Sequence, residues 1–352
     1  MTRALVVDDS HFMRTVISDM LEDGGIQVVD QAANGKEAVE LVAKHEPDVV
    51  TMDVEMPVMN GIEAVERIMQ ETPTPILMLS AVTTDGADAT LEAIDKGAID
   101  FFTKPGGSIS TKLSGQKEEL VAAVRSTAQA DPTAGAGTPT PAPQPVEEPP
   151  SEFVDDPTLI IGASTGGPSV VERIVSELPA VADLRVLIVQ HMPDQFTGRF
   201  AKRLDAASEY DVSEATDGAR IGGGEALVAR GDYHLLVSGY SNGRLRVKLE
   251  QSDPVHSVRP AIDVTMESAA ERIDDPVTAV VLTGMGADGA AGIEALKGTG
   301  ARTIAQDEAT SAVFGIPGRA IETGCIDRVL PVSEITDAIL DAIRRDTQWM
   351  TT

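Results

Sequence analysis

The sequence predicts two α/β domains joined by a linker, and three observations support this. The chain has 352 residues, enough for two domains of ordinary size. Short apolar runs alternate with helical patterns in both halves, as in parallel sheets covered by helices on both faces. A stretch rich in Pro, Ala, Gly and Thr, DPTAGAGTPTPAPQPVEEPP, separates the halves. We expect a first domain over residues 1–125, a linker over 126–152 and a second domain over 153–352.

The first domain is expected to contain strands and helices in regular alternation. The strands are predicted at Ala4–Val7, Gln27–Ala32, Val49–Met52, Ile76–Leu79 and Asp100–Phe102. The helices are predicted at His11–Asp23, Gly35–Lys44, Gly61–Glu71, Thr90–Lys96 and Gln116–Arg125. This order favours one five-stranded parallel sheet.

The second domain repeats the alternation with one interruption. Strands are predicted at Leu159–Ile161, Arg185–Gln190, Gly224–Val228, His234–Ser238, Arg244–Leu249, Val277–Leu282 and Arg302–Ala305. Helices are predicted at Ser169–Leu178, Ala261–Ile273, Asp288–Lys297 and Ser333–Arg344. The segment Ala219–Glu250 favours antiparallel strands, with turns at Gly231-Asp232 and Asn242-Gly243. We therefore expect a doubly wound, mostly parallel α/β sheet with an antiparallel hairpin.

The chain is strongly acidic. It has 28 Lys plus Arg and 56 Asp plus Glu, for a formal net charge of −28. Such a charge repels nucleic acid and anionic membranes, so we expect neither as a partner. Acidity can serve solubility alone, but here the excess is spread along the chain, which favours adaptation to high salt.

Cysteine usage and hydropathy narrow the class of protein further. The single Cys325 excludes an internal disulfide and a metal cage built of cysteines. No apolar stretch is long enough to span a bilayer, and no apolar signal region precedes the first strand. We expect a cytoplasmic protein without membrane insertion, and a monomer.

Acidic residues follow two predicted strands of the first domain. Asp8 and Asp9 come directly after the first strand, and Asp53 follows the third. Because the carboxyl ends of parallel strands meet at one edge of a sheet, we expect these side chains to lie together. Three clustered carboxylates call for a hard cation with oxygen ligands, most simply Mg²⁺.

Two further strand ends carry groups that could hold a phosphoryl group on Asp53. These are the hydroxyl of Ser80 and the ammonium of Lys104. Any single Asp could instead cap a helix, which is a common role. The combination at successive strand ends favours a phosphoryl-transfer site.

These residues resemble the receiver domain of two-component response regulators. The resemblance covers residues 1–125 and is carried by VVDDS at 6–10, MDVEMPVMNG at 52–61, LSA at 79–81 and GAIDFFTKP at 97–105. It implies a flavodoxin-like fold and an acceptor, Asp53, that receives phosphate from a histidine kinase.

The same resemblance assigns roles to the neighbours of Asp53. It implies that Asp9, Asp53 and the backbone carbonyl of Glu55 bind Mg²⁺, with Asp8 acting through water. It implies that Ser80 and Lys104 contact the phosphoryl group. It places Phe101 at the position of the switch aromatic, without the hydroxyl group that many members carry there.

A glycine-rich turn follows the first strand of the second domain. The sequence GASTGGP at 162–168 would place Ser164 between a strand and a helix N-terminus, at the carboxyl edge of the sheet. A phosphate-binding loop is disfavoured, because the turn has neither the Lys of a Walker A loop nor the G-x-G-x-x-G spacing. On this motif alone, a capping serine and a nucleophile stay equally open.

A serine nucleophile needs a base, and the base needs a carboxylate that holds its tautomer. His191 follows a strand at the same expected edge, whereas His234 and His256 are less well aimed. Asp288 lies at a third strand-to-helix turn, where helix capping is the alternative role. Together these positions favour a triad of Ser164, His191 and Asp288. Its chain order differs from the Ser-acid-His order of α/β-hydrolases, so that fold is not implied.

The second domain resembles the catalytic domain of chemotaxis protein-glutamate methylesterases, the CheB family. The resemblance covers roughly residues 153–345 and is carried by IGASTGGP at 161–168, VQHMP at 189–193, GDYHL at 231–235, HSVRPAID at 256–263 and LTGMGADG at 282–289. It implies that Ser164 is the nucleophile, His191 the base and Asp288 the orienting acid. It also implies an oxyanion-hole N–H from Met285 and a supporting hydrogen bond from Thr165.

Together the two resemblances imply a regulated enzyme. The activity would be hydrolysis of glutamate methyl esters on methyl-accepting chemotaxis receptors, with receptor glutamine deamidation as a second reaction and no cofactor at the esterase site. A chemotaxis histidine kinase would phosphorylate Asp53 and so relieve a block that the receiver imposes. The alternatives are a second domain that only binds a partner, which the complete set of triad residues disfavours, and an unrelated small-ester hydrolase, which would need a deep apolar pocket.

The acidity predicts a fold that depends on salt. In dilute buffer the carboxylates repel one another over longer distances, so the protein should loosen. We expect the thermal unfolding midpoint, followed by circular dichroism, to rise between dilute buffer and molar KCl. An unchanged midpoint would contradict adaptation to high salt.

Overall fold

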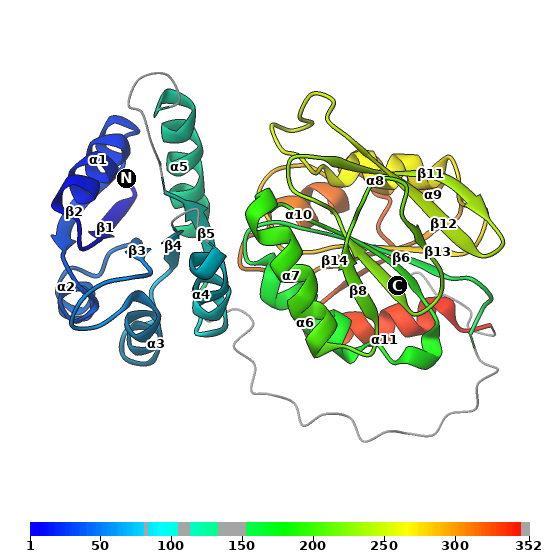
Figure 1. The fold of residues 1–352 in the computed structure, drawn as a ribbon, viewed down its shortest axis with the longest axis horizontal. Helices are drawn as coiled ribbons and strands as arrows, with labels where there is room; N and C mark the ends of the chain where they lie inside the picture. The colour runs from blue at the N-terminus through cyan, green and yellow to red at the C-terminus, as the bar shows by residue number, and fades with distance from the viewer. Residues whose placement is uncertain (81–83, 105–112, 133–152, 346–352) are drawn as a thin grey trace. The chain divides into compact units, whose positions relative to one another are not determined.

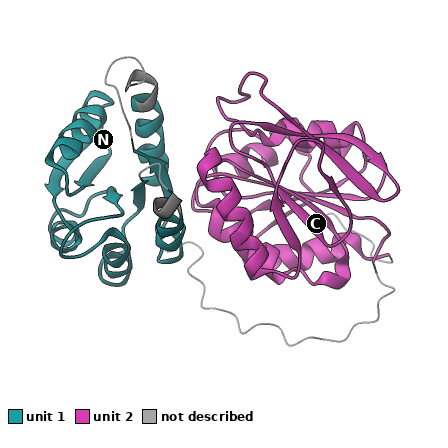
Figure 2. Cartoon of the chain, in the orientation of Figure 1, with its two compact units in different colours: residues 1–134 teal, residues 135–352 magenta. Residues whose placement is uncertain are grey.

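The computed structural model describes residues 1–80, 84–104, 113–132 and 153–345. They form two compact units, residues 1–134 and 135–352 (Figure 2). The described part of the expected linker, residues 126–132, belongs to the end of a helix and the turns after it. Residues 133–152, the remainder of that expected linker, lie outside the described ranges.

The first unit contains one parallel sheet with the strand order β2-β1-β3-β4-β5 (Figure 1). Its strands are β1 (Arg3–Val7), β2 (Gln27–Ala32), β3 (Val49–Asp53), β4 (Ile76–Ser80) and β5 (Asp100–Thr103). The helices are α1 (His11–Asp23), α2 (Gly35–His45), α3 (Gly61–Glu71), α4 (Thr84–Asp95) and α5 (Leu113–Thr127). The order confirms the predicted flavodoxin-like sheet, and α4 begins six residues earlier than expected.

Local side chains define where the first three helices begin. The side chains of Ser10, Asn34 and Asn60 each accept a hydrogen bond from a backbone N–H in the first turn of α1, α2 and α3. Such N-caps satisfy N–H groups that have no partner within the helix. The caps follow the strand ends, so they fix the loops that carry Asp8, Asp9 and Glu55.

The second unit has a seven-stranded parallel sheet and a separate three-stranded antiparallel sheet. The main sheet has the order β15-β14-β13-β6-β7-β10-β8, and the smaller has the order β11-β12-β9. The strands are β6 (Thr158–Ala163), β7 (Arg185–Gln190), β8 (Asp211–Glu214), β9 (Arg220–Ile221), β10 (Glu225–Val228), β11 (His234–Ser241), β12 (Arg244–Glu250), β13 (Val277–Val281), β14 (Arg302–Gln306) and β15 (Arg328–Leu330). This architecture confirms the expected mostly parallel fold with antiparallel strands.

Helices cover both faces of the main sheet. They are α6 (Gly167–Glu177), α7 (Asp194–Ala207), α8 (Ile262–Ala270), α9 (Ala290–Gly298), α10 (Gly315–Glu322) and α11 (Val332–Ile343), with a short 3₁₀ turn at Ala180–Ala182. One group, α6, α7 and α11, lies on the opposite side from α8, α9 and α10 (Figure 1). Every residue of β6, β7 and β13 is buried, as expected for the centre of such a sheet.

One local prediction was wrong. The turn at Gly231-Asp232 does not close a hairpin, because β10 pairs in parallel with β7 and β8 in the main sheet. The turn instead connects the two sheets. The hairpin turn at Asn242-Gly243 is confirmed between β11 and β12, with φ of 53° and 71°. Both φ values lie in the left-handed region that a tight two-residue hairpin turn requires.

Within the described ranges, no helix combines the length and the apolar character needed to cross a membrane.

The turn at Gly231 yields a prediction about stability. A Cβ there would lie 2.2 Å from the backbone nitrogen of Asp194, and backbone atoms cannot move aside cheaply. Gly231→Ala should therefore lower the free energy of unfolding by about 1–3 kcal/mol. The matched control is Gly239→Ala in β11, where a Cβ meets nothing within 4 Å. Urea unfolding in molar KCl checks this, and equal stability of the two variants would contradict the close contact.

Candidate active site and phosphoryl-acceptor site

Ser164 occupies the turn between β6 and α6. Its backbone N–H donates to the Thr283 carbonyl at 3.0 Å, and its own carbonyl accepts from Gly167 N–H at 2.8 Å. Gly166 has a φ of 74°, and a Cβ there would lie 2.6 Å from Ala312. Glycine is therefore required at this turn for both reasons. The turn leaves Ser164 partly exposed at the carboxyl edge of the sheet.

Gln190 joins the turn of Ser164 to the turn of His191. It is buried at the end of β7, and its Nε2 donates to the carbonyl of Ser164 at 2.9 Å and to that of His191 at 3.2 Å. The His191 N–H in turn donates to the Ala163 carbonyl at 3.0 Å. Sequence reasoning missed Gln190, although a polar residue ending a buried strand was an available signal. The two turns are thus held as one unit.

His191 and Asp288 form a hydrogen-bonded pair. His191 Nε2 lies 2.8 Å from Asp288 Oδ2, and their side chains are 11% and 2% exposed. The same carboxylate accepts the backbone N–H groups of Ile262 at 2.7 Å and Asp263 at 2.9 Å. Asp288 therefore caps α8, although it precedes α9 in the chain. Both roles that the sequence left open, capping and pairing with histidine, are present together.

Burial by itself would raise the pKa of Asp288. The hydrogen bond and charge of His191, with the two backbone N–H donors, outweigh burial and lower that pKa below its ordinary value. The carboxylate is therefore ionised at neutral pH. Because it engages Nε2, the other ring nitrogen of His191, Nδ1, is the one left to exchange a proton with another group.

Ser164 and His191 lie at neighbouring strand ends. In the parallel pairing of β6 with β7, Ala163 is the register partner of Gln190, so the next residues of both strands emerge side by side. Over the described ranges, the Ser164 hydroxyl makes no direct hydrogen bond to the His191 ring. Catalytic hydrogen bonds are often long before substrate binds.

The loop after β13 runs against Ser164. A Cβ on Gly284 would lie 2.7 Å from the Ser164 Cβ, so this loop closely approaches the turn that carries Ser164. Met285 follows, and its side chain is 44% exposed. Thr165 is buried, and its carbonyl accepts from Thr283 Oγ1 at 2.9 Å. The expected catalytic contributions of Met285 and Thr165 stay predictions.

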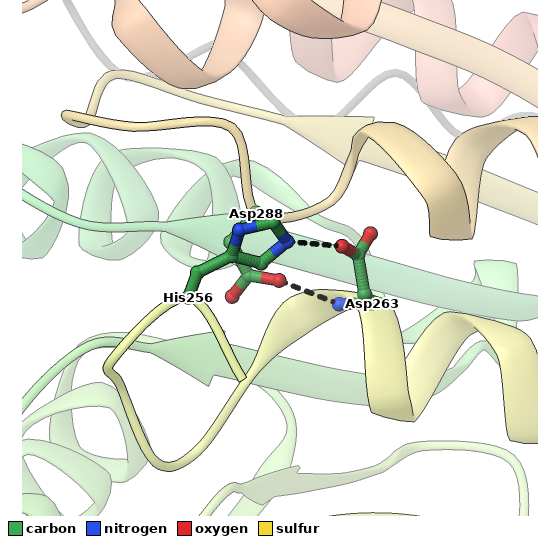
Figure 3. A group of neighbouring side chains, drawn as sticks. All are labelled: His256, Asp263 and Asp288. Carbon is green, nitrogen blue, oxygen red and sulfur yellow. Dashed lines mark hydrogen bonds and ion pairs between the residues drawn. The ribbon is translucent and has the colours of Figure 1, made fainter. Parts of the chain in front are cut away.

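His256 was passed over in favour of His191, yet it also lies near Asp288. Its Nε2 is 2.8 Å from Asp263 Oδ2, and ligand atoms of His256, Asp263 and Asp288 lie within 4.8 Å of one another (Figure 3). Asp263 was not singled out in the sequence. Its partners are brought to it only by the fold.

In the first unit, Asp8, Asp53 and Lys104 meet at the sheet edge. Lys104 Nζ lies 2.8 Å from Asp8 Oδ2 and 2.6 Å from Asp53 Oδ1. Carboxylate oxygens of Asp8, Asp9 and Asp53 lie within 4.8 Å of one another, with Asp9 exposed to solvent. Clustered hard oxygen donors with one exposed member fit a magnesium ion that keeps several waters.

The charges of this cluster are unbalanced. Burial is the largest influence on Asp53, and together with the nearby charge of Asp8 it raises the pKa of Asp53, against the opposing effect of Lys104. Burial alone would lower the pKa of Lys104, but hydrogen bonds to both carboxylates outweigh it and raise that pKa. One ammonium therefore serves two buried acids.

The remaining expected residues lie around this cluster. Ser80 is buried at the end of β4, where its carbonyl accepts the Lys104 N–H at 2.7 Å. Phe101 is a buried residue of β5. Glu55 is exposed two residues after Asp53. Their expected roles in phosphoryl transfer stay predictions.

Comparisons with known proteins agree with both halves of this description. Residues 159–339 match the family model described as CheB methylesterase, and residues 4–111 match that of the response regulator receiver domain. The chain belongs to the CheB methylesterase family. A Halobacterium salinarum protein named protein-glutamate methylesterase/protein-glutamine glutaminase is 69% identical over 99% of this chain and 100% of that protein.

More distant CheB relatives match the chain as well, one along nearly its whole length and one in the second domain. A Pyrococcus horikoshii protein of the same name is 43% identical over 97% of this chain and 93% of its own length. The crystal structure of the Thermotoga maritima CheB methylesterase catalytic domain matches with a TM-score of 0.51 and 41% identity, covering 53% of this chain and 98% of that domain. Relatives of the same name from Halobacterium salinarum, Haloarcula marismortui and Natronomonas pharaonis are 60–69% identical, and these haloarchaeal sources support a halophilic origin.

The raised pKa of Asp53 predicts the effect of removing its charge. A carboxyl with a raised pKa stabilises the fold below its unfolded pKa of 3.8, and this stabilisation is lost as pH rises through the folded pKa. At pH 7, without divalent ions, Asp53→Asn should therefore raise the unfolding temperature of the receiver transition by a few degrees. Calorimetry of the full chain measures this, with the exposed Asp9→Asn as control. A lower transition for Asp53→Asn would contradict the assignment.

Proposed function

We propose that this CheB family member hydrolyses γ-methyl esters of glutamate on methyl-accepting chemotaxis receptors and releases methanol. The name of the relative from Halobacterium salinarum supports this activity, since that protein is 69% identical along its full length. The observation that carries the proposal is the hydrogen bond between His191 and the ionised Asp288, at the sheet edge where Ser164 emerges. This is the arrangement that activates a serine hydroxyl.

Each step of the reaction falls to a residue of this edge. Ser164 Oγ attacks the ester carbonyl while His191 Nδ1 takes its proton, and Asp288 stabilises the resulting imidazolium. The oxyanion is held by backbone N–H groups, that of Met285 among them. His191 then gives the proton to the departing methoxy oxygen, which leaves as methanol. The same nitrogen next takes a proton from water as the water attacks the acyl group, and it then gives this proton to Ser164 Oγ as the bond to the acyl group breaks, which frees the glutamate side chain.

The same residues suit a primary amide. Attack of Ser164 on a receptor glutamine would give the same acyl intermediate, with ammonia as the leaving group. The second half of the relatives' printed name, protein-glutamine glutaminase, supports this second activity. Thr165, next to the nucleophile, would support the turn in both reactions.

Control would come from the receiver. A chemotaxis histidine kinase would transfer phosphate to Asp53, and Asp8, Asp9 and Asp53, with the Glu55 carbonyl, would hold Mg²⁺. The ion, when bound, neutralises charge on the phosphoryl group. Lys104 would exchange its bond with the Asp53 carboxylate for one with a phosphoryl oxygen.

This exchange of partners by Lys104 would be the physical origin of the change that phosphorylation causes in the receiver. Ser80 would hold a second phosphoryl oxygen, and Phe101 would move as the switch aromatic. The unphosphorylated receiver, residues 1–125, would restrain the esterase, residues 153–352, and the linker between them would permit release. We place the protein in the cytoplasm, as a monomer, where kinase and receptor signalling regions would be accessible.

Methanol release from methylated receptor membranes in high-salt buffer tests the proposal. We expect Ser164→Ala to reduce release by about 10⁴-fold or more. The matched control is Ser169→Ala, an exposed serine on α6, which should leave release unchanged. A phosphodonor with Mg²⁺ should stimulate the parent chain but not Asp53→Ala.

Two outcomes would contradict the account. Methanol release that persists in Ser164→Ala would contradict the assignment of the triad and favour a second domain that only binds a partner. Stimulation that persists in Asp53→Ala would remove control through this acceptor while leaving the esterase in place.

A further inference from the structure

Two buried carboxylates cross between the starts of α8 and α9. Asp288 precedes α9 but accepts the first N–H groups of α8, those of Ile262 and Asp263. Asp263 lies in the first turn of α8 but its Oδ1 accepts the N–H groups of Gly289 and Gly292 at the start of α9, both at 2.8 Å. The N-terminus of α8 is thus capped by Asp288, which precedes α9, and the N-terminus of α9 is capped by Asp263, which lies in α8.

The second oxygen of Asp263 has a different partner. Asp263 Oδ2 lies 2.8 Å from His256 Nε2, and Figure 3 shows the ring of His256 turned toward this carboxylate, with Asp288 behind it. The Asp263 side chain is buried, whereas His256 is exposed on a loop. The hydrogen bonds therefore run from the loop through Asp263 to the turn that carries Asp288.

A cation is a poor occupant of this cluster. Both oxygens of Asp288 and both oxygens of Asp263 already accept hydrogen bonds from N–H donors. A metal would have to displace bonds to four backbone N–H groups and two histidines. The positive ends of two helix dipoles already compensate the two negative charges.

The position of Asp288 depends on a turn that has little stiffness of its own. Gly286 and Gly289, on either side of Asp288, have φ of 94° and 95°, so the turn is built around glycines. Asp263 fixes this turn from outside through the N–H groups of Gly289 and Gly292. Without that anchor, the Asp288 carboxylate would still bind α8, but its approach to His191 would be free to change.

We propose that Asp263 is a positioning residue, which holds the turn of Asp288 so that its carboxylate meets His191 Nε2, and that His256 orients Asp263. This rests on the proposed function, because it assigns Asp288 to the esterase reaction. A displacement of about 1 Å at a catalytic group can lower the rate by roughly 10²-fold. Asp263 would therefore act on kcat, since its side chain bonds to His256 and to the backbone N–H groups of Gly289 and Gly292.

Steady-state methanol release by the full-length chain in molar KCl tests this. We expect Asp263→Ala to lower kcat by about 10- to 100-fold while KM changes little. Asp263→Asn should restore most of kcat, since its amide oxygen can still accept the N–H groups of Gly289 and Gly292. The control is Glu267→Ala, an exposed acid one turn further along α8, which should match the parent. The low-field proton resonance of the His191 Nε2–H should shift in Asp263→Ala and not in Glu267→Ala.

Other results would show whether the positioning role of Asp263 or the proposed function itself is wrong. If Asp263→Ala lowers only the melting temperature, with kcat and the resonance equal to those of Glu267→Ala, the positioning role is overturned. If Asp263→Ala does not fold, His256→Ala takes its place and should lower kcat several-fold at constant KM, and a kcat equal to that of the parent overturns the proposal. If Ser164→Ala in the same series keeps full activity, the proposed function itself fails and the positioning role with it.

Discussion

The second unit depends on keeping the Asp288 carboxylate charged inside the protein. An isolated buried carboxylate is unfavourable and would take up a proton. Here His191 and the first N–H groups of α8 surround it and lower its pKa instead. These partners come from segments far apart in the chain, so the same hydrogen bonds also fix how the end of β7 and the starts of α8 and α9 meet. The stability of the unit and the orientation of His191, the proposed base, therefore have the same cause.

Asp53, the proposed phosphoryl acceptor of the receiver, is in the opposite situation. Asp53 shares one ammonium with Asp8 and has a raised pKa, so its ionised form is poorly satisfied. A fully paired carboxylate would be a poor acceptor, because its partners would have to leave before a phosphoryl group could arrive. The chain thus contains one buried acid that is saturated with donors, which suits the proposed orienting role of Asp288, and another that is left short of them, which suits the proposed acceptor role of Asp53.

Much of this could be predicted from the sequence, because the parallel sheets impose a simple rule. Apolar runs that end in polar residues bring those residues to one edge, which placed Asp53 and Asp288 correctly relative to their strands. Some elements were missed: β9 and β15 have too few residues for a pattern, and α7, although continuous, contains Gly198, a residue of low helix propensity. Gln190 and Asp263 were missed because each bonds to groups distant in sequence: the carbonyl of Ser164 for Gln190, 26 residues away, and the N–H groups of Gly289 and Gly292 for Asp263, 26 and 29 residues away. The remaining partner of Asp263, His256, is only seven residues away, but it lies on a loop before α8, so no helical pattern relates the two residues.

The most direct test of the central claim is to locate the activated serine chemically. The full chain in molar KCl would be treated with a fluorophosphonate, which reacts covalently with activated serines, then digested and analysed by mass spectrometry. The account predicts one adduct, on Ser164, formed much more slowly in His191→Ala and in Asp288→Ala. An active esterase whose Ser164 stays unmodified, or an adduct that forms equally well without His191, would contradict it.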